Sequence, residues 1–241
     1  MNDDTADQAA RTGRAGRRRR RSREKHLAFY RLVEACAEPE CPVCSLSRRR
    51  VEQYFDGLLY EKVNDRELRE RFRSAGGFCN PHSFQFVGYH DALAASILYR
   101  DLLLAWLQEP FAVPAQASNG VLPDCPVCRE KAKSEEGYLA LLGDFLEDVQ
   151  LKQALLSCDG FCLPHFSALE CRQRRGRNPL PAWLMDMQRR RVERIAADLA
   201  ACVDSSNFSL GSKRPPLGRD TEVAWKKAVH KTAGFPARAP G

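Results

Sequence analysis

A motif of cysteine, proline and histidine occurs twice in this chain and constrains its fold more than any other feature. Both copies begin with Cys-Pro-Val-Cys and continue, further along the chain, with Gly-Phe-Cys-x-Pro-His. The first copy comprises residues 41–44 and 77–82, and the second comprises 125–128 and 160–165. Equivalent residues lie 84 positions apart in the first part of the motif and 83 apart in the second part. Such a near-constant offset indicates an internal duplication.

Each copy supplies three thiols and one imidazole, which is the ligand set of a closed tetrahedral zinc site. We therefore predict two Zn2+ ions per chain, one within each copy. The expected ligands are Cys41, Cys44, Cys79 and His82 for the first ion, and Cys125, Cys128, Cys162 and His165 for the second. The free energy of zinc binding, on the order of 10 kcal/mol or more, offsets the entropy lost in closing each loop.

The prolines of the motif support this interpretation. Pro42 and Pro126 stiffen the Cys-x-x-Cys turn before a metal binds. Pro81 and Pro164 suit the first turn of a helix, where the missing N–H is not needed. A cysteine and a histidine three residues apart then share one helix face. The same ligands also suit an iron–sulfur cluster, which is the alternative cofactor.

Four cysteines lie outside the motif, namely Cys36, Cys158, Cys171 and Cys202. They show no pairing pattern, so we expect them to pack as small apolar residues. Cys36 lies five residues before Cys41, and Cys158 lies four residues before Cys162. Either of these two is therefore an alternative metal ligand.

The positive charge of the chain is concentrated at its ends. The formal net charge is +7, of which residues 1–25 carry +5 and residues 204–241 carry +4, so that residues 26–203 carry −2. The first 23 residues have almost nothing to bury and are predicted to be a disordered basic arm. A run within it is the candidate contact to nucleic acid or another anionic surface, through counterion release: Arg17, Arg18, Arg19, Arg20 and Arg21.

The sequence shows neither a secretory signal nor the ~20 uncharged apolar residues of a membrane span. We therefore expect a cytoplasmic protein without a membrane association. Thiols stay reduced in that compartment and are available to zinc.

Helical periodicity predicts an all-α fold of two helical repeats, each stapled by a Cys3His metal site. The expected helices cover 24–37, 45–64, 65–75, 81–107, 131–147, 149–157, a segment from 164, and 181–202. The residues expected in the core of the helix at 81–107 are Phe84, Val87, Leu93, Ile97, Leu98, Leu102, Leu103 and Trp106. The predicted organisation is a disordered tail (1–23), a first zinc-binding repeat (24–108), a linker (109–124), a second zinc-binding repeat (125–203) and a basic C-terminal tail (204–241) with a docking helix at about 221–232.

The doubled CPVC and GFCxxH motifs resemble those of an uncharacterised bacterial family classed as a domain of unknown function. Two further segments share the likeness, Ser96-Ile97-Leu98-Tyr99-Arg100-Asp101-Leu102-Leu103 and Glu222-Val223-Ala224-Trp225-Lys226-Lys227-Ala228-Val229 with Ala233-Gly234. The resemblance covers about 24–234, although 207–219 departs from the family's aromatic and basic pattern. It implies metal sites in a helical fold and brings no established activity.

Four protein ligands leave no position for water or substrate at either ion, unlike a catalytic zinc site. The sequence therefore favours a non-enzymatic protein that binds a protein partner. The alternatives are an iron–sulfur or thiol redox protein and a nucleic-acid-associated protein that acts through its arginine-rich arm. A redox Cys-x-x-Cys normally belongs to a βαβ unit, which is not expected here.

Overall fold

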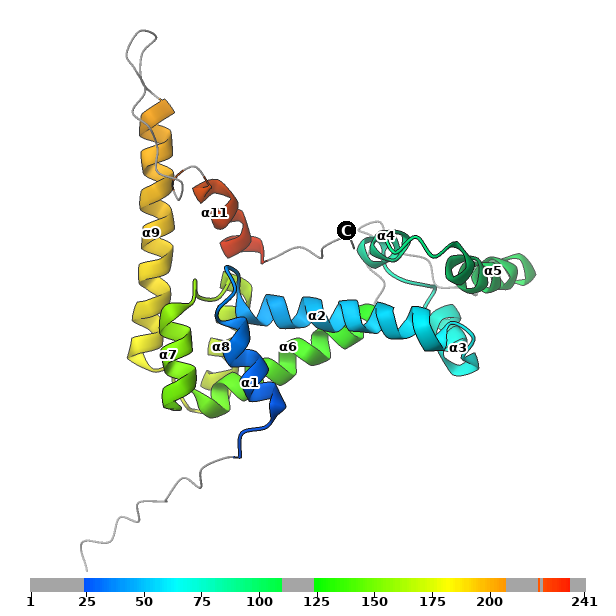
Figure 1. The fold of residues 1–241 in the computed structure, drawn as a ribbon, viewed down its shortest axis with the longest axis horizontal. Coiled ribbons are helices and arrows are strands. Elements are labelled where there is room, and N and C mark those ends of the chain that lie inside the picture. The colour runs from blue at the N-terminus through cyan, green and yellow to red at the C-terminus, as the bar shows by residue number, and fades with distance from the viewer. Residues whose placement is uncertain (1–23, 110–123, 207–220, 222, 235–241) are drawn as a thin grey trace, which may run out of the picture.

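The structure of the protein is a computed structural model, which describes residues 24–109, 124–206, 221 and 223–234. All regular secondary structure in these residues is helical, as predicted (Figure 1). The basic arm with Arg17 to Arg21 and nearly all of the expected linker lie outside the described residues. The helices are α1 (Leu27–Ala35), α2 (Pro42–Gly57), the π-helical η1 (Leu58–Lys62), α3 (Arg66–Ser74), α4 (Asn80–Val87), α5 (Ala92–Gln108), α6 (Pro126–Phe145), α7 (Val149–Ser157), α8 (Leu163–Arg175), α9 (Ala182–Ser206) and α11 (Ala224–Ala233).

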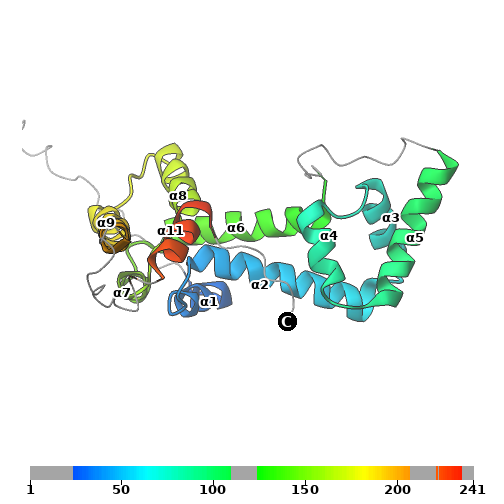
Figure 2. The same ribbon diagram turned by 90° about the horizontal axis from the view of Figure 1, so that it is seen from above.

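Two long helices, α2 and α6, form the centre of the molecule and run antiparallel (Figures 1 and 2). Their 16 and 20 residues correspond to about 24 and 30 Å. Arg50 of α2 forms an ion pair with Glu130 of α6. Pro42 and Pro126 occupy the first turn of their helices, so α2 and α6 begin within the Cys-Pro-Val-Cys segments, earlier than the expected starts at 45 and 131. The two Cys-Pro-Val-Cys turns therefore lie at opposite ends of the central pair.

Each end of this pair has its own hydrophobic core. At one end, α1 and the start of α2 pack with the end of α6 and with α7, α8 and α9, around Phe29, Leu142 and Phe161. At the other end, the second half of α2 packs with η1, α3, α4, α5 and the start of α6, around Phe55 and Phe78. Both cores thus contain residues from before and after the linker.

The single helix expected at 81–107 is wrong, because the structure breaks it into α4 and α5. Gly88 caps the end of α4, and His90 adopts a positive φ of 57°. Asp91 then caps α5 by accepting a hydrogen bond from the Ala94 N–H at 2.8 Å. A side-chain cap of this kind stabilises a new helix start, which the uninterrupted apolar periodicity concealed.

Part of the expected core is also wrong. Apolar side chains of α4 and α5 are largely exposed, with relative accessibilities of 70% for Phe84, 72% for Leu93 and 63% for Leu103. Val87 and Trp106 are exposed as well. The helix α5 lies at the edge of the molecule, beyond α3 (Figure 2), so only one of its faces is covered. In the described part of the chain, no helix is both long and apolar enough to cross a membrane.

Candidate metal centres

The eight cysteine and histidine residues of the motif gather in two groups of four, but not in the predicted combinations. Cys41 and Cys44 lie with Cys162 and His165, in a group called the first centre below. The second centre consists of Cys79, His82, Cys125 and Cys128. Each Cys-x-x-Cys turn therefore faces the Cys-x-Pro-His segment of the other copy. The prediction that each site forms within one copy is wrong.

The direction of α2 and α6 explains this exchange. From Cys44, α2 carries the chain about 24 Å away, and the short η1 and α3 keep it at that far end. The segment with Cys79 and His82 follows there. The antiparallel α6 begins at the same end, so it places Cys125 and Cys128 beside that segment. At the other end, α7 and α8 return Cys162 and His165 to the start of α2.

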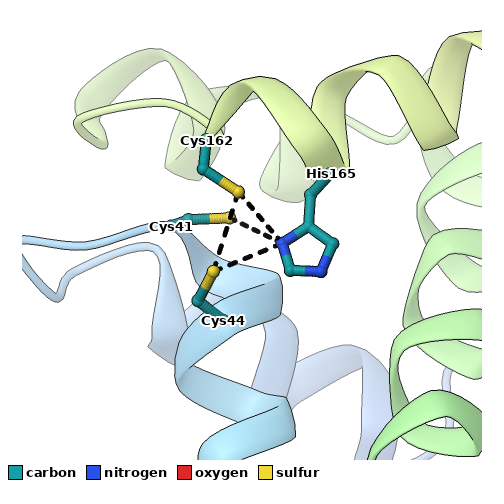
Figure 3. A group of neighbouring side chains, drawn as sticks. All are labelled: Cys41, Cys44, Cys162 and His165. Carbon is teal, nitrogen blue, oxygen red and sulfur yellow. Dashed lines mark hydrogen bonds between the residues drawn. The ribbon is translucent and has the colours of Figure 1, made fainter. Parts of the chain in front are cut away.

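In the first centre, the ligand atoms converge from the start of α2 and the start of α8 (Figure 3). The His165 Nδ1 lies 3.1 Å from the Cys162 Sγ, 3.3 Å from the Cys44 Sγ and 3.6 Å from the Cys41 Sγ. The Cys44 and Cys162 sulfurs are 3.7 Å apart. All four ligand atoms point toward one common volume.

The second centre repeats this geometry. The His82 Nδ1 lies 3.1 Å from the Cys79 Sγ, 3.3 Å from the Cys128 Sγ and 3.7 Å from the Cys125 Sγ. The Cys79 and Cys128 sulfurs are 3.5 Å apart. In both centres, three residues are buried and one is partly exposed.

These distances suit a single tetrahedral ion. A zinc ion with Zn–S bonds of about 2.3 Å and a Zn–N bond of about 2.0–2.1 Å places its ligand atoms about 3.5–3.8 Å apart. The separations given above run from 3.1 to 3.7 Å, and all four ligand atoms of each group lie within 4.8 Å of one another. Both groups can therefore hold one metal ion with protein ligands in all four positions.

The turns that lead into the two Cys-x-Pro-His segments owe their shape to glycine. Gly77 and Gly160, which precede the Phe-Cys of each copy, have positive φ angles of 93° and 80°, a region that other residues adopt only at a cost. At Gly160, a Cβ atom would also lie 2.8 Å from the Gln188 Oε1. The buried Gln188 amide accepts a hydrogen bond from the Phe161 N–H at 3.0 Å and donates one to the Phe161 carbonyl at 2.8 Å. It thereby fixes the backbone next to Cys162.

A carboxylate supports the histidine of the first centre. The Glu135 Oε1 lies 3.3 Å from the His165 Nε2, an arrangement that orients a metal-binding imidazole and fixes its tautomer. By the 84-residue offset, the equivalent position in the other copy is Val51, which is buried and apolar. The two centres therefore differ beyond their ligands.

The C-terminal helix α11 covers the first centre. The Lys231 Nζ donates hydrogen bonds to the Asp159 carbonyl at 2.7 Å and to the Phe161 carbonyl at 3.2 Å. Gly234, with a φ of 82°, comes so close that a Cβ atom there would lie 3.6 Å from the Cys44 Sγ and 3.8 Å from the Cys162 Sγ. The expected docking helix is thus part of the surroundings of the metal centre.

The electrostatics of the first centre favour a bound cation. Burial opposes protonation of His165, but contacts with the sulfurs of Cys162, Cys41 and Cys44 and with the Glu135 carboxylate outweigh it and raise its pKa well above the ordinary range. A metal ion satisfies the same negative surroundings in place of that proton.

Sequence reasoning did not identify Glu135, Gln188 or Lys231. They contact His165 or the backbone of residues 159–161 from other helices, and no local spacing in the sequence signals such contacts. Cys36 and Cys158 are not among the eight grouped residues. Cys171 is exposed, so the expectation that it packs as a small apolar residue is wrong, and Cys202 is partly exposed.

The comparisons with known proteins identify one relative. No protein-family model and no solved structure matches the chain. It is 31% identical over 139 residues to an "Uncharacterized 23.9 kDa protein in xynA 3'region" from Caldicellulosiruptor sp. (strain Rt8B.4). The match covers 56% of this chain and 68% of the relative.

Proposed function

The chain belongs to the family of that uncharacterised Caldicellulosiruptor protein, and we propose that it is a non-enzymatic, zinc-binding helical protein whose two ions are structural. The observation that carries this proposal is the closed ligand set of both centres. Three sulfurs and one imidazole nitrogen occupy the four tetrahedral positions, whereas a catalytic zinc ion keeps one position for water or substrate. In this role, each ion joins the two copies of the motif.

The compactness of both groups favours zinc over an iron–sulfur cluster. The four protein ligands of a cluster are distributed over two or more iron atoms, so some of their ligand atoms lie further apart than the ligands of one ion. All ligand atoms of each group lie within 4.8 Å of one another, which suits a mononuclear ion.

Metal analysis tests this proposal. Native mass spectrometry of protein purified without added metal is expected to show two zinc ions per chain, in colourless protein. Removal of zinc with a strong chelator is expected to abolish the cooperative thermal transition, because the binding free energy of a structural ion is folding free energy. A brown protein that contains iron and sulfide would overturn the zinc assignment. A metal-free chain with an unchanged transition would overturn the structural role.

We further propose that the exposed apolar side chains of α4 and α5 bind a protein partner. Phe84, Val87, Leu93, Leu103 and Leu107 expose more than half of their surface. The last three recur on one side of α5 at helical spacing, and an exposed apolar patch is typical of interaction sites. The double substitution Leu93→Glu and Leu103→Glu is expected to abolish capture of that partner, whereas Arg66→Glu on the exposed side of α3 is expected to preserve it. Equal capture by the wild type and the double variant would contradict this assignment.

A further inference from the structure

Cys36 and Cys158 occupy equivalent places at the ends of two helices that meet. Cys36 is the C-cap of α1 and Cys158 is the C-cap of α7, and these helices pack against each other. Their thiols donate hydrogen bonds to the last turn of their own helices, to the Leu32 carbonyl at 3.3 Å and to the Leu155 carbonyl at 3.1 Å. Both side chains are buried in the same core.

The exchanged pairing of the metal centres brings these two cysteines together. Cys36 precedes Cys41 by five residues, and Cys158 precedes Cys162 by four. Cys41 and Cys162 are neighbours in the first centre, with their sulfurs within 4.8 Å. Two short segments that converge at one metal centre therefore also converge a few residues earlier, where the Cys36 and Cys158 side chains are close enough for each to shift the pKa of the other.

The surroundings of Cys158 are polar for a buried side chain. Its sulfur accepts a hydrogen bond from the Gly160 N–H at 3.2 Å. The Lys231 ammonium group is bound to the carbonyl of the next residue, Asp159. A position that only filled space would not need a donor and a cation beside the sulfur, whereas both groups stabilise a thiolate.

We propose that Cys36 and Cys158 form an oxidisable dithiol, separate from the eight metal ligands, that closes to a disulfide in the presence of a peroxide. The Cys158 thiolate attacks one oxygen of hydrogen peroxide, which gives a sulfenic acid and hydroxide. The Cys36 thiol then displaces the sulfenic oxygen, so that the S–S bond forms and water leaves. Overall, two thiols lose two electrons and two protons, and one peroxide is reduced to two molecules of water.

The electrostatic balance at Cys158 supports its role as the attacking sulfur. The nearby Cys36 side chain lowers the pKa of the Cys158 thiol, and the Gly160 N–H, Arg191 and Lys231 lower it further against the effect of burial. The partner Cys36 keeps its proton, because the nearby Cys158 side chain and burial raise its pKa. Cys158 first gives up the proton that it donates to the Leu155 carbonyl, and its thiolate then attacks while Cys36 remains a thiol.

The test is to treat the full-length, zinc-loaded chain with a small excess of hydrogen peroxide and to map its thiols. Remaining thiols are alkylated under denaturing conditions, and the chain is cleaved at aspartate and glutamate. Glu38 and Glu40 separate Cys36 from Cys41, and Asp159 separates Cys158 from Cys162. The expected result is one linked peptide pair that contains Cys36 and Cys158, with a loss of two hydrogen atoms per chain and with both zinc ions retained.

Three variants complete the test. The linked pair is expected to disappear in Cys36→Ala and in Cys158→Ala, and to persist in Cys171→Ala, which removes an exposed thiol. The proposal is overturned if Cys36 and Cys158 are both recovered as alkylated thiols after Cys171 or the ligand cysteines have reacted. It is also overturned if the wild type forms a different disulfide. The mapping of the wild type decides the question even where a variant fails to fold, and it is independent of which metal the centres hold.

Discussion

Replacement of Gln188 by methionine removes the side-chain amide that holds the turn before Cys162, at nearly constant volume. The Phe161 N–H then loses its bond to the Gln188 Oε1 at 3.0 Å in a buried position. A buried donor without a partner costs about 1–3 kcal/mol. The Phe161 carbonyl loses a second bond of 2.8 Å but keeps the contact from Lys231 at 3.2 Å, so this part costs about 0.5–1.5 kcal/mol. We therefore expect a decrease in the free energy of unfolding of about 2–4 kcal/mol.

Urea denaturation of the zinc-loaded variant, followed by far-UV circular dichroism, measures this change. The control is Arg189→Ala, at the next residue of α9, whose side chain is exposed. Its free energy of unfolding should stay within about 0.5 kcal/mol of that of the wild type. The variant should also release the ion of the first centre sooner than that of the second in competition with a chelator. A loss below about 0.5 kcal/mol, or equal release from both centres, would refute the role of Gln188 in fixing this turn.

Three further changes probe the two centres. Glu135→Gln removes the carboxylate at His165 and should weaken metal binding about 10–100-fold in the first centre alone, as measured by chelator competition. Glu136→Gln, at an exposed carboxylate of the same helix, is the matched control, and equal weakening of both centres by Glu135→Gln would count against the assignment. Gly234 has φ 82° and ψ 176°, a conformation that essentially only glycine adopts. Gly234→Val should therefore destabilise the docked α11 by about 1–3 kcal/mol; limited proteolysis that is unchanged at α11 would contradict this. Acidification should release both ions, because cysteine and histidine ligands must lose their protons to bind a metal; a zinc content that is constant down to about pH 4, read with a chromogenic chelator, would argue against such ligands.

The sequence identified the ligand types because cysteine and histidine spacing is a local property. Pro81 and Pro164 begin helices as their position in the motif predicts, and helical periodicity correctly indicated an all-α fold. These features depend only on residues a few positions apart.

The pairing of the ligands could not be read in the same way. Both copies offer the same atoms at the same spacing, so Cys44 is chemically as well matched to His82 as to His165. The shorter loop favoured the local pairing, but loop-closure entropy grows slowly with length. The antiparallel packing of α2 on α6 outweighs this entropy difference. It places each Cys-x-x-Cys turn beside the Cys-x-Pro-His segment of the other copy.

The exposed face of α5 marks a second limit of sequence analysis. Leu93, Leu103 and Trp106 fit the apolar periodicity of a core helix, yet they are exposed. Periodicity reports that a helix has an apolar face, but not whether that face is covered by the same chain.

Anomalous diffraction at the zinc absorption edge tests the exchanged, metal-linked pairing most directly. The expected map contains two peaks, one bonded to Cys41, Cys44, Cys162 and His165 and the other to Cys79, His82, Cys125 and Cys128. Peaks that join each Cys-x-x-Cys turn to the Cys-x-Pro-His segment of its own copy, or crystals without bound metal at these residues, would contradict it.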